Sequence, residues 1–208
     1  AARRLDDFFA YEALLADPAG GARKEWVVGP YSYYNQFRYN PNNEPDLHVP
    51  WMYTLIGQPW KTSTVLHAAQ QLFTNAPNGV TGNDDLGTMS AWYLFSAMGL
   101  YPVVPGTGQF VLHAPRFSRV DVDMGNGRTL RIEAPQAGDG KPRYIRDVSL
   151  DGRDHAAVWL DWERLRQGGR LRFDLTDAPQ PQGWGTRAQD LPASPCTVEP
   201  ASSSGAGR

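Results

Sequence analysis

The sequence predicts an α+β protein in which a helical segment precedes a small antiparallel β domain. Apolar side chains recur at roughly helical spacing near the N-terminus, over residues 4–16. After Pro105-Gly106 the apolar period shifts toward two, which is typical of strands. From residue 178 onward Pro, Gly, Ser and Gln dominate. We therefore expect a helical part over 1–108, a β domain over 109–177 and a disordered tail over 178–208.

Four helices are expected in the first part: 4–16, 45–56, 64–73 and 88–98. Pro18-Ala19-Gly20-Gly21 ends the first, and Pro45 suits the first turn of the second. Thr62 or Ser63 could cap the third, and Gly99 stops the fourth. An aromatic, turn-rich stretch lies between the first helix and the second.

The β domain should contain five short strands, over 110–112, 120–123, 129–132, 148–150 and 170–175. Gly125-Asn126-Gly127 and Asp151-Gly152 are turn signals of the kind that join antiparallel strands. Residues 159–165 fit either a strand or a helix.

Composition excludes several classes of function. The net charge is −2 with both signs mixed along the chain, so we expect no nucleic-acid partner. No apolar run approaches the ~18 residues that a membrane span needs. The single cysteine, Cys196, cannot form an internal disulfide. Seven Trp, nine Tyr and eight Phe suit either a bulky core or sugar stacking, and composition alone favours the core.

Two polar loops at predicted helix starts concentrate side chains that can carry chemistry: Asn43-Glu44-Pro45-Asp46-Leu47-His48, and the stretch from Gly79 to Ser90. Taken alone, each could simply place carboxylates at a helix N-terminus. Taken together, they could supply the acid and the base of a glycosidase, with Glu44 as acid and Asp84 or Asp85 as base. The adjacent aspartates also suit a calcium site.

His48 falls on the first turn after Pro45. A lone histidine is more often structural, or a hydrogen-bond donor to substrate, than a metal ligand. No Cys/His spacing, nucleophile elbow or phosphate-binding loop accompanies it.

Four blocks in fixed order carry a specific resemblance. They are Asn43-Glu44-Pro45, Gly57-Gln58-Pro59-Trp60-Lys61-Thr62, Gly82-Asn83-Asp84-Asp85-Leu86-Gly87-Thr88-Met89-Ser90-Ala91-Trp92-Tyr93 and Gly99-Leu100-Tyr101-Pro102. This arrangement closely resembles glycoside hydrolase family ninety-two, and the likeness covers roughly residues 1–175.

The resemblance implies an inverting, calcium-dependent exo-α-mannosidase that acts on terminal mannose of glycans. It implies that residues 1–108 are part of an (α/α)6 catalytic toroid, with the N-terminal β-sandwich and the rest of the toroid missing from this chain. It also implies a secreted or periplasmic protein. In the family the calcium ion contacts the O2 and O3 hydroxyls of the terminal mannose.

The resemblance also assigns roles to residues. It makes Asp85 the catalytic base and gives Asn83 or Asp84 an assisting or metal-binding role, so that Asn83 and Asp85 are the expected metal ligands. Asn43 and Glu44 would contact the leaving-group sugar, and we add His48 to this substrate-binding set.

Two features limit the resemblance. The family's general acid is a Glu in an aromatic-rich segment upstream of the Glu-Pro block, and only Glu12 and Glu25 precede that block here. Asn42 stands where Gly is common. The alternative is therefore a catalytically incompetent carbohydrate-binding or structural fragment, which the aromatic residues of Tyr31–Tyr39 would suit. A chain that associates through uncovered helices is a third possibility.

Overall fold

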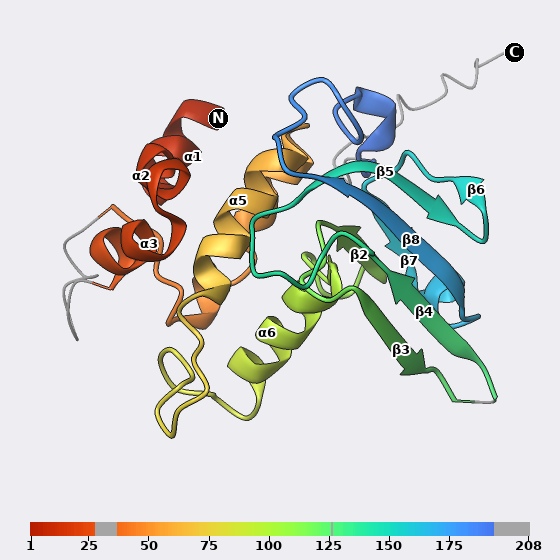
Figure 1. Cartoon of the computed structure of the whole chain (residues 1–208), viewed down its shortest axis with the longest axis horizontal. Coiled ribbons are helices and arrows are strands. Elements are labelled where there is room, and N and C mark those ends of the chain that lie inside the picture. The colour runs from red at the N-terminus through yellow and green to blue at the C-terminus, as the bar shows by residue number, and fades with distance from the viewer. Residues whose placement is uncertain (28–36, 126, 194–208) are drawn as a thin grey trace, which may run out of the picture.

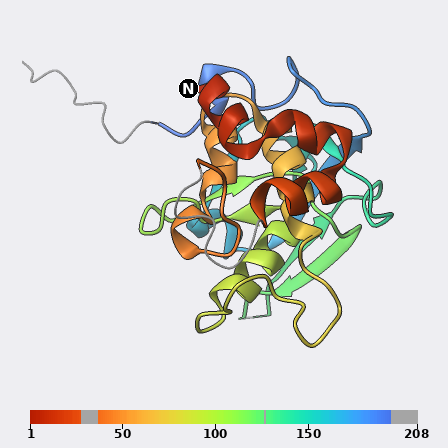
Figure 2. The ribbon, with the colours of Figure 1, turned by 90° about the vertical axis from the view of Figure 1, so that its left-hand side faces the viewer.

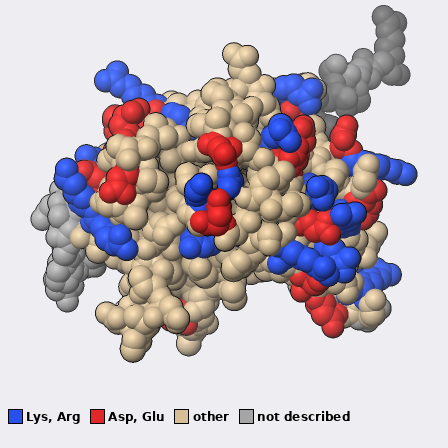
Figure 3. All heavy atoms as spheres, in the orientation of Figure 1, with Lys and Arg blue, Asp and Glu red and all other residues tan. Residues whose placement is uncertain are grey.

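A computed structural model describes residues 1–27, 37–125 and 127–193. Its longer helices gather on one side and its strands on the other, with the N-terminus on the helical side (Figure 1). In the same orientation, basic and acidic side chains are interspersed over the strand side (Figure 3). The longer helices are α1 (Ala2–Phe9), α2 (Tyr11–Ala16), α3 (Pro18–Trp26), α5 (Pro59–Gln70) and α6 (Thr88–Met98). The helix-then-sheet order predicted from the sequence is confirmed.

The first predicted helix is two helices, because Ala10 adopts a left-handed conformation with φ 52°. The carbonyl of Phe9 at this break accepts a 3.0 Å hydrogen bond from the indole nitrogen of Trp26. The residues expected to end the helix instead begin α3, where the Asp17 side chain accepts from the Gly20 amide at 3.0 Å. Gly21 is required there, since a Cβ atom would lie 2.7 Å from the Ala13 carbonyl of α2.

The second predicted helix is divided into three short pieces, η2 (Glu44–Asp46), η3 (Val49–Trp51) and α4 (Met52–Leu55). Pro50 explains the division, because it has no N–H to donate within a longer helix. The third helix starts at Pro59, earlier than expected, so Thr62 and Ser63 are buried interior residues and do not cap it. The fourth helix has the predicted bounds.

The strands form two sheets. The three-stranded sheet has the order β1-β2-β7, and the five-stranded sheet has the order β3-β4-β8-β5-β6. The bounds are β1 (Leu100–Tyr101), β2 (Gln109–Leu112), β3 (Arg119–Asp123), β4 (Thr129–Glu133), β5 (Tyr144–Leu150), β6 (Arg153–Asp154), β7 (Trp159–Asp161) and β8 (Gly169–Thr176), with α7 (Trp162–Leu165) before β8.

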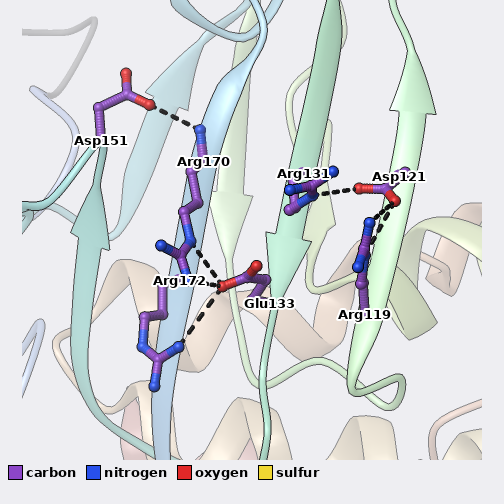
Figure 4. Close-up of polar contacts among 7 residues, drawn as sticks. All are labelled: Arg119, Asp121, Arg131, Glu133, Asp151, Arg170 and Arg172. Carbon is purple, nitrogen blue, oxygen red and sulfur yellow. Dashed lines mark hydrogen bonds and ion pairs between the residues drawn. The ribbon is translucent and has the colours of Figure 1, made fainter.

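The expectation of a purely antiparallel β domain is wrong at one pair. The last strand, β8, inserts between β4 and β5, so it runs antiparallel to β5 and parallel to β4. Ion pairs cover the outer face of this sheet (Figure 4). Arg119 and Arg131 both bind Asp121, while Arg170 and Arg172 share Glu133.

The disorder predicted from residue 178 is wrong for residues 178–193, which pack onto the β domain. Trp184 is buried and its indole nitrogen donates to the His155 carbonyl at 2.8 Å. The short helix η4 (Ala188–Asp190) follows, and its Asp190 carbonyl accepts from Val158 at 2.9 Å. Burial of the Trp184 side chain thus holds this segment on the β domain despite its turn-forming composition. The rest of the predicted tail, residues 194–208, lies outside the described residues.

Two apolar cores stabilise the protein, one among the helices and one among the strands. They meet where β1, which directly follows α6, pairs with β2 of the β segment. The division at residue 108 stays a prediction. No helix in the described part of the chain is long and apolar enough to cross a membrane.

Candidate active site

The first predicted loop, residues 43–48, belongs to a longer loop over residues 40–48 that is held by its own polar groups. We name residues 40–48 the Glu-Pro loop. The amide of Asn40 donates to the Asp46 carboxylate at 3.2 Å, and the amide of Asn42 donates to the Asn40 side chain at 3.1 Å. Burial raises the pKa of Asp46, and the Asn40 N–H acts in the opposite direction. Asp46 therefore shapes the loop, a role that the sequence did not reveal.

The three residues predicted to bind substrate lie on this loop in different environments. Glu44 begins η2, and its Oε1 atom is buried with no hydrogen-bond partner among the described residues. Asn43 is half-buried, and the side chain of His48 is exposed. A buried carboxylate oxygen without a partner is costly, so Glu44 is the one of the three that the structure leaves in need of a ligand.

The second predicted stretch, residues 79–90, includes the first residues of α6. The loop before that helix, residues 74–87, extends from the lower edge of the helical side (Figures 1 and 2). We name it the Asp-Asp loop. The carboxylate of Asp84 accepts from the Ser90 amide at 2.9 Å and from the Ser90 hydroxyl at 2.7 Å. These bonds lower the pKa of Asp84. Asp84 is thereby fixed to the first turn of α6.

Asp85 differs from its neighbour. It starts a run of three left-handed residues, with φ values of 44° at Asp85, 58° at Leu86 and 91° at Gly87. Its carbonyl accepts from the Thr88 hydroxyl at 2.7 Å, whereas its exposed carboxylate has no hydrogen bond within the described part of the chain. Left-handed backbone at non-glycine residues is strained, and such strain clusters at functional sites.

The structure brings the two loops together. The Thr81 hydroxyl donates a hydrogen bond to the Asn42 side chain. A Cβ atom at Gly82 would lie 2.6 Å from the Asn42 carbonyl, so only glycine allows this approach. At the base of the loops, the Trp92 indole of α6 donates to the Leu47 carbonyl at 3.0 Å. Asn42, at a position where the resemblance expects Gly, therefore joins the two motifs.

The residues predicted to bind calcium have suitable chemistry but form only part of a site. Asn83 offers an amide oxygen and Asp85 a carboxylate, and calcium prefers such ligands. The ion takes six to eight oxygens, so two side chains supply a minority of them. Within residues 1–27, 37–125 and 127–193, no group of three or more His, Cys, Asp or Glu side chains could hold a metal.

Of the aromatic stretch that motivated the carbohydrate-binding alternative, the structure describes an exposed Phe37 and a buried Tyr39. Most of Tyr31–Tyr39 lies outside the described residues. Tyr39 itself is only 1% exposed and packs in the helical core against Phe9 and Trp26. This ring is a core residue and cannot stack on a sugar.

Comparisons with known proteins agree with the motifs. Residues 1–177 match the glycosyl hydrolase family 92 catalytic domain. A protein of Arthroderma benhamiae, described as an uncharacterised secreted glycosidase, is 30% identical over an alignment of 156 residues that covers 73% of this chain and 20% of that protein.

Two solved structures from Bacteroides thetaiotaomicron are similar in fold. A family 92 α-mannosidase in complex with mannoimidazole gives a TM-score of 0.72 at 27% identity, over 84% of this chain and 24% of that chain. A family 92 inverting mannosidase gives 0.69 at 30% identity, over 88% and 26%. This chain thus spans a fifth to about a quarter of the length of its relatives. The family match covers most of its residues, and the chain belongs to glycosyl hydrolase family 92.

Proposed function

We propose that this chain carries the general base of an α-mannosidase active site, within a larger enzyme that removes terminal α-linked mannose with inversion. One observation carries the proposal: Asn42 holds the Glu-Pro loop against the Asp-Asp loop, so that residues forty positions apart share one surface. The family match and the mannosidase structures give that surface its chemistry.

Asp85 is the proposed base and Asp84 a positioning residue. In an inverting reaction the base removes a proton from water, whose oxygen attacks the anomeric carbon from the face opposite the leaving oxygen. A carboxylate that already accepts two hydrogen bonds is a weaker base, as Asp84 is here. The carboxylate of Asp85 is exposed and free of such bonds in the described structure. We assign the general acid, which protonates the leaving oxygen, to no residue of this chain.

The Glu-Pro loop is proposed to bind the leaving-group sugar. The buried Oε1 atom of Glu44 needs a donor, and a sugar hydroxyl can supply one. Asn43 is half-buried beside it and offers both a donor and an acceptor. His48, exposed at the start of η3, is proposed to donate to substrate from the rim.

We further propose that the enzyme needs calcium, with Asn83 and Asp85 among the ligands. Bound there, the ion would supply positive charge to the mannose hydroxyls. The side-chain oxygens of Asn83 and Asp85 are hard donors of the kind that calcium prefers, which supports this assignment. A secreted or periplasmic location is also proposed, in keeping with the secreted glycosidase of Arthroderma benhamiae.

The proposal is tested on the complete protein that contains these residues. Release of mannose from α-1,2-, α-1,3- and α-1,6-mannobiose is measured with and without a calcium chelator, and NMR identifies the first anomer formed. We expect β-mannose from at least one substrate, loss of activity with the chelator, and recovery with calcium. Full turnover in chelator would refute the calcium requirement. Release of α-mannose would refute inversion, and no release from any substrate would refute the function.

A further inference from the structure

A small cavity lies between α5 and the β domain, and no residue of the Glu-Pro loop or the Asp-Asp loop lines it. Four residues of α5 line it together with residues 114–116 and with the loop between β4 and β5, which lies against α5 in Figure 1. Its volume is about 30 Å³. A buried water occupies roughly 10–15 Å³ measured in this way, so the cavity has room for about two waters or one small ion.

Two of the arginines that line this cavity have a buried donor without a partner. Nη1 of Arg116 and Nε of Arg143 are both buried without a hydrogen bond among the described residues. Arg143 uses its other nitrogens to bind Asp139, at 2.6 Å, and Asp177. Arg116 makes no ion pair in the described part of the chain, so its charge has no carboxylate beside it.

The lining of the cavity is cationic. It includes Arg116, Lys141 and Arg143 but no Asp or Glu. With the two carboxylates that bind Arg143 counted, one positive charge remains uncompensated. His67 also lines the cavity, and burial, helped by the nearby Arg116 charge, lowers its pKa to about 4. At neutral pH the imidazole is therefore uncharged and can donate a hydrogen bond.

We propose that this cavity binds one small monovalent anion of the chloride class, held by the free N–H groups of Arg116 and Arg143. A buried N–H donor without a partner is destabilising, and an anion that accepts from both guanidinium groups would satisfy the two donors and balance the remaining positive charge. A volume of about 30 Å³ holds a chloride or bromide ion but not a whole gluconate ion. Because the lining residues come from both α5 and the β domain, the bound anion would stabilise the contact between them.

Thermal unfolding of the 208-residue chain tests the proposal. Chloride replaces gluconate at constant ionic strength, so that screening stays the same. We expect chloride and bromide to raise Tm by about 2–4 °C once the anion exceeds its Kd severalfold. Arg116→Gln should abolish this rise. Arg153→Gln, which removes an exposed arginine of β6 outside the cavity, should preserve it.

Crystals of the wild-type chain grown in bromide give a second readout that does not depend on how the variant folds. We expect an anomalous peak within hydrogen-bond distance of Nη1 of Arg116. An ordered water at that position with no bromide signal would overturn the proposal. So would equal Tm values in chloride and gluconate, or an equal chloride effect in Arg116→Gln.

Discussion

Trp51, His113 and Ser96 form a hydrogen-bonded chain of buried groups where the two cores meet. The Trp51 indole donates to Nδ1 of His113 at 3.1 Å, and Nε2 of His113 lies 2.8 Å from the Ser96 carbonyl. Nδ1 must accept and Nε2 must donate, which requires the neutral imidazole with its proton on Nε2. Burial lowers the pKa of His113 to about 4.

The His113 imidazole should make the stability of the chain depend on pH. Its pKa is about 6.5 in the unfolded chain and lower in the fold, so the unfolded state binds more protons between pH 6.5 and 4. The contribution of the neutral imidazole to stability is fully present above pH 6.5 and is lost as the pH is lowered through this window. We expect protonation of His113 alone to make the free energy of unfolding about 2–3 kcal/mol lower at pH 4.5 than at pH 7.5.

Urea unfolding of the wild type and of His113→Gln measures this effect. The glutamine amide can replace the Nε2 donor but cannot be protonated, so the variant should lose that part of the pH dependence. His48→Gln, at an exposed position, serves as the control and should keep it. The same slope in all three proteins would contradict the role of His113.

Residue types alone did not separate the two aspartates of the candidate site. Asp84 and Asp85 are adjacent in sequence, and either could activate water. The structure separates them through Ser90, six positions beyond Asp84, whose amide and hydroxyl engage only the first carboxylate. These hydrogen bonds come from a residue of the first turn of α6, so the types of the two adjacent residues could not anticipate them.

Elements with local signals were predicted well. Helix α6 has left-handed glycines at both ends, Gly87 and Gly99, and both were visible in the sequence. The start of α5 was missed because its buried threonines look like caps. Helix α3 was missed because Gly20 and Gly21 look like a break, although Gly21 permits close packing on α2 and Gly20 leaves room for the Asp17 cap. Tertiary contacts therefore override local propensity at both places.

Helix α5 depends on a hydroxyl cluster that no periodic pattern shows. The Thr62 hydroxyl lies 2.7 Å from the Thr54 hydroxyl, accepts from the Thr54 amide and donates to the Pro50 carbonyl at 3.0 Å. We expect Thr62→Val to lower the free energy of unfolding by about 1–3 kcal/mol, since it leaves buried polar groups without partners.

Thr62→Ser is the matched variant, because it keeps the hydroxyl and removes one methyl group. Its expected cost is about 1 kcal/mol or less. Urea unfolding of both variants compares them at the same position. If the valine variant proved as stable as the serine variant, the hydroxyl cluster would not be what holds α5 to the preceding turn.

At the scale of the molecule, the α+β order and the position of both polar loops followed from sequence, whereas the arrangement of the strands did not. The parallel pairing of β4 with β8 joins segments separated by three other strands, so no turn signal reports it. Helix α6 is apolar around most of its surface yet leaves Leu94 56% exposed. An apolar helix is usually buried, which agrees with a site completed by further parts of a larger enzyme.

The central claim is that the carboxylate of Asp85 is the base of a mannosidase site. Turnover of mannobiose by the complete protein, measured for Asp85→Asn beside Asp17→Asn, tests it most directly. Asp17 is an exposed cap of α3 where asparagine serves equally well, so that control should retain wild-type turnover. We expect Asp85→Asn to keep the folded CD spectrum and lose at least about 100-fold in kcat. Near-normal turnover in a folded Asp85→Asn protein would contradict the account.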